Sequence, residues 1–202
     1  MRILLYVEGD TEFRCLPSFL QKWLDSRIQH KVEIKAVNFQ GVTNYKKDFA
    51  QRARRDLQGN FVAGVVGLID YYGSGFTTGD GSIAERCARA KAELEQEVGV
   101  AAFKQHFAVH ETEAWLFSDP RIFDTTIQPA LPTTQLPEII NNDNPPARRL
   151  DTIYQQRMGR HYSKTIDGKT LFDALDPEIA YNRCPHLKLL VNDVLALATS
   201  GR

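Results

Sequence analysis

Four short runs in the first half of the chain have the hydrophobic patterns of β-strands. Arg2–Val7 and Phe61–Ile69 are nearly continuous apolar runs, as expected of strands covered on both faces. Lys31–Val37 alternates between apolar and polar residues, which indicates a half-exposed strand at the edge of a sheet. Ala101–Val109 is mixed but still predicts a strand. The pattern therefore predicts a sheet of about four strands.

Segments with helical spacing separate these strands. Ser82 followed by Glu85 matches a capping box at the start of the third segment. Pro17 removes a hydrogen bond within the first segment, so this helix is expected to begin near Cys15 or to bend there. The predicted apolar stripes consist of Phe13, Leu16, Leu20, Trp23 and Leu24, then Tyr45, Phe49, Ala53 and Leu57, then Ile83, Cys87, Ala90, Leu94 and Val98. This alternation predicts an α/β fold with a mostly parallel sheet flanked by helices.

The composition changes after Asp119-Pro120. Frequent prolines and asparagines predict a long irregular connection there, and helical patterns return at about Ala147–Gln156 and Cys184–Ala198. We therefore predict an α/β domain over residues 1–118 and a loop-rich, helical C-terminal extension over 119–202 that packs on it as a cap. The apolar face of the last helix is predicted to contain Leu187, Leu190, Val191, Val194, Leu195 and Leu197.

Acidic residues lie where three of the predicted strands end. Glu8 follows the first strand, Asp70 ends the third, and Glu111 and Glu113 follow the fourth, while Glu12 lies four residues beyond Glu8. Parallel strands bring their carboxyl ends to one edge of a sheet, where open α/β folds bind ligands. Converging carboxylates require a cation, and oxygen ligands select magnesium, calcium or manganese. The sequence therefore predicts a divalent-metal site that contains these five acids.

Each of these residues also has a structural alternative. Glu8 would stabilise a helix amino terminus, and Glu12 would be an ordinary surface residue. His110 either orients a carboxylate or only packs at the strand end. A second group consists of basic residues that either hold phosphates or are simply solvated, namely Arg148, Arg149 and Lys164.

Composition limits the classes of partner. The chain has 25 basic and 25 acidic residues among 202, so it lacks the basic footprint of a protein that binds DNA tightly by itself. No apolar run approaches the roughly 18 residues of a membrane span, and a strand begins at the amino terminus, so we expect a cytoplasmic protein without a signal peptide. Cys15, Cys87 and Cys184 have no metal-site spacing and are expected to be buried free thiols.

Four ordered motifs resemble a known family. Val7–Glu12 is similar to the first motif of Toprim domains, especially that of overcoming-lysogenization-defect nucleases, in which one glutamate follows the first strand and another lies four residues on. Asp70–Gly73, His110–Asp119 and Cys184–Leu187 resemble a narrower family, the Toprim-like domain-of-unknown-function family 4276, over nearly the whole chain. The resemblance implies a Toprim-like fold that binds Mg²⁺ or Mn²⁺ and acts on DNA or RNA backbones. It also implies an ATPase partner in a bacterial defence system.

The chain departs from the Toprim pattern at one point. Toprim domains have two aspartates one residue apart after the third strand, whereas here Asp70 is followed two positions later by Tyr72, a poor magnesium ligand. Either Glu111 or Glu113 substitutes for the missing carboxylate, or the metal site is incomplete. We therefore consider two hypotheses. The first is a metal-dependent nuclease in which Glu8, Asp70 and Glu111 are catalytic, and the second is a non-catalytic module that binds an ATPase or a nucleotide.

Overall fold

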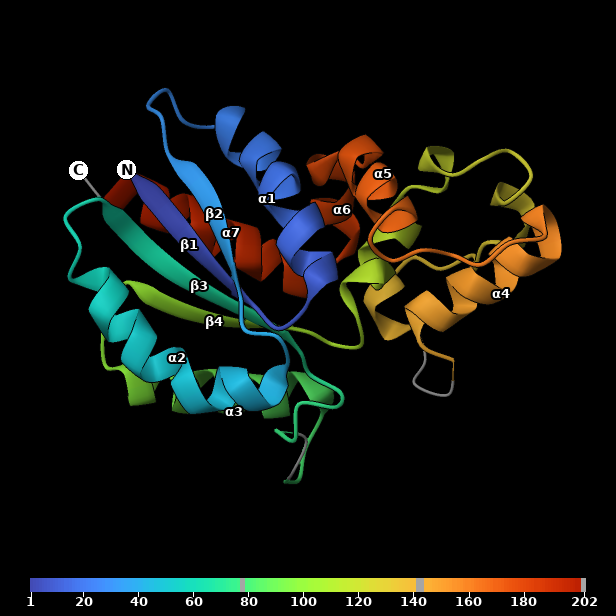
Figure 1. Ribbon diagram of the computed structural model, residues 1–202. Coiled ribbons are helices and arrows are strands. Elements are labelled where there is room, and N and C mark those ends of the chain that lie inside the picture. Colours follow the sequence, from blue (N-terminus) through green and yellow to red (C-terminus); the bar gives the residue numbers. More distant parts are fainter. Residues whose placement is uncertain (77–78, 141–143, 201–202) are drawn as a thin grey trace.

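A parallel four-stranded sheet lies at the centre of the computed structural model, which describes residues 1–76, 79–140 and 144–200 (Figure 1). The strands are β1 (Arg2–Val7), β2 (Glu33–Asn38), β3 (Val62–Asp70) and β4 (Phe103–Ala108), in the order β2-β1-β3-β4. Every neighbouring pair is parallel. The predicted α/β fold is confirmed, and each strand lies within about two residues of its predicted range.

The register brings the carboxyl ends of the strands to one edge of the sheet. Val7, the last residue of β1, pairs with Leu68 of β3, and Asp70 of β3 pairs with Ala108 of β4. The residues that directly follow β1 and β4 therefore lie at the same edge as Asp70. The alternating strand β2 is an edge strand, as predicted, and its Glu33 is exposed while Ile34 is buried.

Helices cover both faces of the sheet (Figure 1). One face packs against α2 (Val42–Leu57) and α3 (Ile83–Val98), with Tyr6, Val65 and Ile69 contributed by the strands. The opposite face packs against α1 (Asp10–Asp25) and α7 (Pro185–Ser200). The predicted capping box of α3 is confirmed, because the Ser82 hydroxyl accepts from the Glu85 amide and the Glu85 carboxylate accepts from the Ser82 amide.

Of the two predicted alternatives for α1, a start near Cys15 was wrong. The helix begins at Asp10, directly after β1, and Pro17 lies in its interior rather than near its start. A helix tolerates one missing backbone bond when its buried face is well packed, and the acidic first turn is favourable at the positive helix end. Phe13 was predicted to lie in the apolar stripe but is 43% exposed. The buried positions centre on Leu16 and Phe19, roughly a quarter of a turn away from Phe13.

The C-terminal extension contains more helix than the sequence pattern predicted. Helix α4 (Pro146–Met158) and α7 were expected, but α5 (Asp167–Ala174) and α6 (Pro177–Arg183) were missed. The segment with the irregular composition contains the short 3₁₀ helices η2 (Pro120–Ile122), η3 (Gln128–Ala130) and η4 (Pro137–Ile139), and η1 (Thr112–Ser118) precedes it.

The last helix is an integral layer of the α/β fold. It contacts β1, β3 and β4 directly, and the Trp23 indole on α1 donates to the Val191 carbonyl on α7 at 3.2 Å. Of its predicted apolar face, Leu195 is only partly buried, while the other five residues are buried. The helices α4 and α5 lie beyond the carboxyl ends of the strands, close to the edge where the acidic residues are expected (Figure 1).

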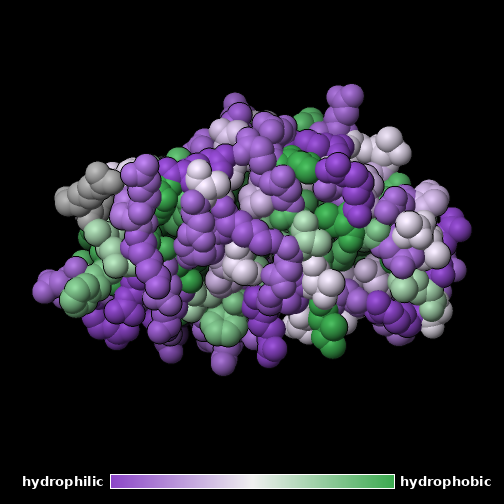
Figure 2. Space-filling model, turned by 90° about the horizontal axis from the view of Figure 1, so that it is seen from above, coloured by the Kyte–Doolittle hydropathy of each residue, from purple (hydrophilic) through white to green (hydrophobic). Residues whose placement is uncertain are grey.

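The surface seen from above is polar (Figure 2), and the three cysteines lie in the interior. The face seen from above, over α1 and α5, is mostly hydrophilic (Figure 2). Within residues 1–76, 79–140 and 144–200, no helix is long and apolar enough to cross a membrane. Cys15, Cys87 and Cys184 are free and buried, as predicted.

Candidate functional site

The five predicted acids meet at the carboxyl edge of the sheet. Glu8 follows β1, Glu12 lies in the first turn of α1, Asp70 ends β3, Glu111 precedes η1, and Glu113 lies within η1. Burial raises the pKa of Asp70 well above its usual range, and the negative charges of the four glutamates raise it further. All four charges act on this one buried carboxyl group, so the four glutamates lie within electrostatic range of Asp70. The structure thus brings the predicted site residues together.

Two of these acids change protonation near neutral pH. Burial raises the pKa of Glu8 to about 7, and the nearby charge of Glu12 contributes to the shift. Burial likewise raises the pKa of Glu113 to about 7, although the ammonium of Lys164 lowers it and thus limits the shift. The Glu113 side chain is 1% exposed. Such shifted acids are common where proton transfer or cation binding occurs.

Glu12 is buried and directed into the cluster, so its alternative as a surface residue is wrong. The Thr112 hydroxyl donates to Glu12 Oε1 at 3.2 Å. A Cβ atom added at Gly9 would lie 3.0 Å from Glu12 Oε2, so the glycine leaves room for the carboxylate. Gly9 is also the N-cap of α1, and in the described part of the chain no side chain makes a cap hydrogen bond there, so Glu8 does not cap α1 through a hydrogen bond.

A lysine from the C-terminal extension contacts this cluster. Lys164 Nζ lies 2.8 Å from Glu111 Oε1 and 3.4 Å from Glu113 Oε1. The pKa of Lys164 is raised, because the charges of Glu113 and Glu111 outweigh the cost of burying the ammonium. Glu111 Oε2 accepts from the Ala147 amide at 2.8 Å, so Glu111 also caps the first turn of α4. Sequence reasoning had suggested Lys164 as a phosphate contact and had missed its contacts with these acids.

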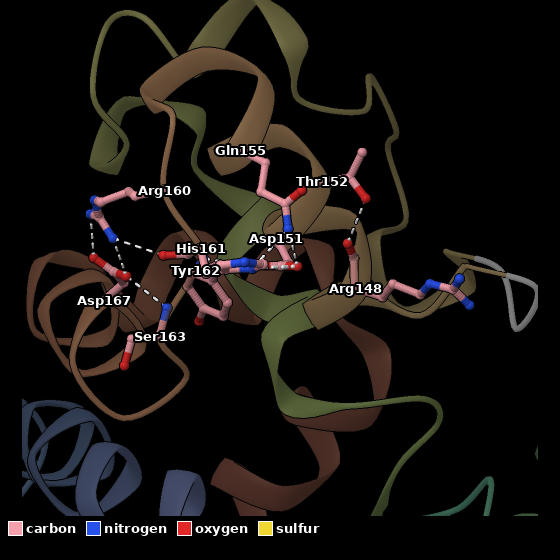
Figure 3. A network of polar contacts seen from close by, with 9 residues as sticks. All are labelled: Arg148, Asp151, Thr152, Gln155, Arg160, His161, Tyr162, Ser163 and Asp167. Atoms are coloured by element: carbon pink, nitrogen blue, oxygen red, sulfur yellow. Dashed lines mark hydrogen bonds and ion pairs between the residues drawn. The ribbon is translucent and has the colours of Figure 1, made fainter.

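A polar network fixes the loop that carries Lys164 (Figure 3). Asp151 of α4 accepts from the Tyr162 amide at 2.9 Å and lies 3.0 Å from His161 Nδ1. Asp167, at the start of α5, accepts from the Ser163 amide at 2.8 Å and from the Arg160 guanidinium. These bonds hold the residues on both sides of Lys164 and so restrict the position of its ammonium group.

The other candidates have different environments. His110 is buried, and its ring stacks on Tyr72 with centroids 4.8 Å apart and an interplanar angle of 3°. Arg148 is exposed, and its guanidinium points away from the network in Figure 3. Arg149 is partly buried, and its Nε has no hydrogen-bond partner within residues 1–76, 79–140 and 144–200. In the part of the chain that the structure describes, Lys164 is the predicted basic residue that pairs with the acids.

The donor set has the chemistry of a site for a hard divalent cation. It consists of carboxylates, which magnesium and manganese prefer. Glu113 Oε1 is buried and has no hydrogen-bond partner among the described residues, although Lys164 Nζ lies 3.4 Å from it. Among the described residues, no group of three or more His, Cys, Asp and Glu side chains stands in an arrangement that could hold a metal ion. Lys164 supplies the positive charge on one side of the cluster. The donor types are those that a divalent cation prefers, and Lys164 contacts two of the five acids, Glu111 and Glu113.

One comparison with known proteins gives a match. The family model described as a domain of unknown function (DUF4276) matches residues 7–195. No curated protein and no solved structure matches the chain significantly.

Proposed function

The chain belongs to this family of domains of unknown function, and from that premise we propose that it is a metal-dependent phosphodiesterase that cuts DNA or RNA. The observation that carries the proposal is that Glu8, Glu12, Asp70, Glu111 and Glu113 lie at one sheet edge, where burial and the charges of the four glutamates raise the pKa of Asp70. Buried carboxylates that lie close together destabilise the folded protein when no cation is bound. The cluster therefore favours a function that requires a bound cation. The resemblance to Toprim domains supports the same reaction class.

Each residue has a role in this proposal. Magnesium or manganese, when bound, would neutralise the phosphate and lower the pKa of a water nucleophile. Asp70 and Glu111 would be ligands, together with Glu12 and Glu113. Glu8 would be either a ligand or the group that exchanges a proton with the attacking or leaving oxygen, because its pKa is raised to about 7.

Lys164 is suited to contact the substrate phosphate. Its side chain is 45% exposed while its ammonium lies at the acids, so it faces both the cluster and the solvent. The flexible lysine side chain can move from a carboxylate to a phosphate, and its ammonium stays protonated with either partner. A substrate phosphate that binds beside the cluster would therefore share this ammonium with Glu111.

The protein is proposed to act with a partner. Its formal charge is zero, so it gathers nucleic acid poorly by electrostatics alone. An ATPase that holds the nucleic acid would supply this missing attraction. The family resemblance supports such an ATPase, and with it a role in a bacterial defence system.

A second candidate function is a non-catalytic interaction module. It is favoured by the contact of Lys164 with Glu111 and Glu113, which already neutralises part of the cluster, and by Tyr72 at the position of a Toprim aspartate. In this case the acids and the lysine would serve to join the C-terminal extension to the sheet. The partner would be an ATPase or a nucleotide.

The deciding experiment is a cleavage assay with Glu8→Gln protein. Wild type and variant would be incubated with single- and double-stranded DNA and RNA, with magnesium, manganese or chelator, at low salt, with and without a candidate ATPase partner. We expect Glu8→Gln to lower the rate about a hundredfold or more, the scale of general acid-base assistance. Glu93→Gln, an exposed change on α3, should leave the rate unchanged. Equal cleavage by wild type and Glu8→Gln protein, or none by either, would favour the interaction module.

A further inference from the structure

A separate cavity of about 340 Å³ opens beside the acidic cluster. It lies between the start of α3, the residues after β4, η4 and the start of α7. Its walls are mainly apolar and include Ile83, Val109, Leu136, Ile139 and Pro185. Neither the acids nor Lys164 line it, so the cavity is distinct from the proposed catalytic site.

His110 connects the cavity with the acidic cluster. It lines the cavity and directly precedes Glu111, whose carboxylate belongs to the cluster. Its ring is held flat against Tyr72, which follows Asp70 by two residues. A molecule with one part at the acids and an adjoining part in the cavity would therefore pass His110.

The floor of the cavity is fixed by a buried carboxylate. Glu138 accepts from the Trp115 indole at 2.9 Å and from the amides of His186 and Leu187 at 2.8 and 3.0 Å. These bonds join η4 to η1 and to the first turn of α7, so the walls are set before any ligand enters. The rim differs from the floor, because Leu136 and Ile139 are 45% and 66% exposed. Exposed apolar side chains at a preformed opening indicate a surface that a ligand covers.

We propose that this cavity binds an unpaired nucleobase of a single-stranded nucleic acid whose phosphate lies at the acidic cluster. The inference rests on the proposed function and names its substrate class. A cavity near the lower end of the range for small-molecule sites admits one base and its sugar but excludes a duplex. Apolar walls beside the imidazole ring of His110 suit a base, which proteins that bind single strands recognise by stacking. The imidazole of His186 provides a polar group at the wall.

Binding of short single-stranded oligonucleotides to the intact protein, at low salt and with calcium as the cation at the acidic cluster, tests this proposal. The probes are fluorescently labelled DNA and RNA of mixed sequence, and an abasic DNA of equal length and charge. We expect wild type to bind the base-containing probes about tenfold more tightly than the abasic one, the scale of base stacking. Equal affinity for the probes with and without bases would overturn the proposal.

Two alanines on α3 provide a matched pair of variants. Ala84 lines this cavity, whereas Ala88 lines only a neighbouring cavity of about 260 Å³. Both are exposed, so substitution should leave the fold intact. Ala84→Phe should lower the affinity for the base-containing probes to that for the abasic probe, and Ala88→Phe should not. Ile139→Ala, which shortens an exposed wall, should weaken the same binding several-fold without filling the cavity.

The results of these experiments distinguish failure of the base site from failure of the proposed phosphodiesterase. Preference for bases that survives in Glu8→Gln protein supports the cavity as a base site, even if no preparation cleaves nucleic acid. Cleavage that proceeds equally on both kinds of probe, with no effect of Ala84→Phe, overturns the base site and leaves the phosphodiesterase in place. If Ala84→Phe and Ala88→Phe instead both abolish self-association and leave oligonucleotide binding unchanged, the two cavities form an interface between copies and the base site is overturned.

Discussion

Lys164 Nζ lies 2.8 Å from Glu111 Oε1, although the two residues are 53 positions apart in the sequence. Glu111 follows the last strand of the sheet, while Lys164 lies in the loop between α4 and α5. The contact therefore joins the predicted C-terminal extension, residues 119–202, to the acidic edge of the predicted domain over residues 1–118. The candidate site is formed by both parts of the chain.

Removal of the Lys164 ammonium should destabilise the protein at pH 8. Lys164→Ala leaves Glu113 buried without its nearby cation, which is costly for an ionised carboxylate. The expected loss is on the order of 1 to 2 kcal/mol, less than for a fully buried pair, because Lys164 is 45% exposed. Urea unfolding measures it. Lys169→Ala breaks the exposed pair with Asp173 and should change stability little, and a Lys164→Ala protein as stable as this control would contradict the prediction.

The stability of the metal-free protein should depend on pH through Glu113. Its pKa is about 7 in the folded protein and ordinarily 4.5, so between these values the folded state holds more protons than the unfolded state. Stability therefore rises as the pH falls from 7 towards 4.5. Glu113→Gln should remove on the order of 3 kcal/mol of this increase in the free energy of unfolding, since one pKa unit corresponds to about 1.4 kcal/mol. Parallel pH profiles of wild type and Glu113→Gln in chelator would show that Glu113 is not the titrating group.

Divalent cations should raise the melting temperature through Asp70. The folded state alone presents the assembled acids, so millimolar magnesium or manganese stabilises it by mass action. Asp70→Asn removes the carboxylate on which the other charges act and should abolish the response in a thermal-shift titration. Asp48→Asn, an exposed change on α2, is the control and should respond as wild type does. Wild type that is insensitive to both ions would favour the interaction module.

The strands and most of the acidic site could be predicted because they depend on local pattern and on topology. Apolar runs identify β1 and β3, and a parallel arrangement then places Glu8 and Asp70 at one edge whatever the details of packing. Phe13 shows the limit of this reasoning. Its spacing to Leu20 fits an apolar stripe, but the position of a helix relative to the sheet decides which side of that stripe is buried.

The contribution of the extension could not be read from the sequence. Helices α5 and α6 have 8 and 7 residues, which is about two turns each and too short for a clear period. Lys164 lies in a loop that Asp151 and Asp167 hold by hydrogen bonds, and these contacts depend on the tertiary structure. The aspartates have no distinguishing local pattern. Sequence alone could therefore suggest Lys164 as a phosphate contact but not as a partner of the acids.

The loop network should be coupled to the Lys164 contact. Asp167→Ala removes the acceptor of the Ser163 amide, and the loss of that bond should cost on the order of 1 kcal/mol. If the loop then no longer holds Lys164 at Glu111, Lys164→Ala should cost less in the Asp167→Ala background than in wild type. Urea unfolding of the two single variants and the double variant should give a coupling energy of about 1 kcal/mol, which is typical of residues in one network.

An aspartate on the other face of the sheet serves as the control for this cycle. Asp56, near the end of α2, accepts from the Tyr6 hydroxyl at 2.7 Å, so Asp56→Ala and Lys164→Ala should be additive. Additive effects of Asp167→Ala and Lys164→Ala would mean that the Lys164 ammonium reaches the acids without the network. The attraction of Glu111 and Glu113 alone would then suffice to position it. Coupling would instead show that the loop network positions the Lys164 ammonium beside the acidic cluster.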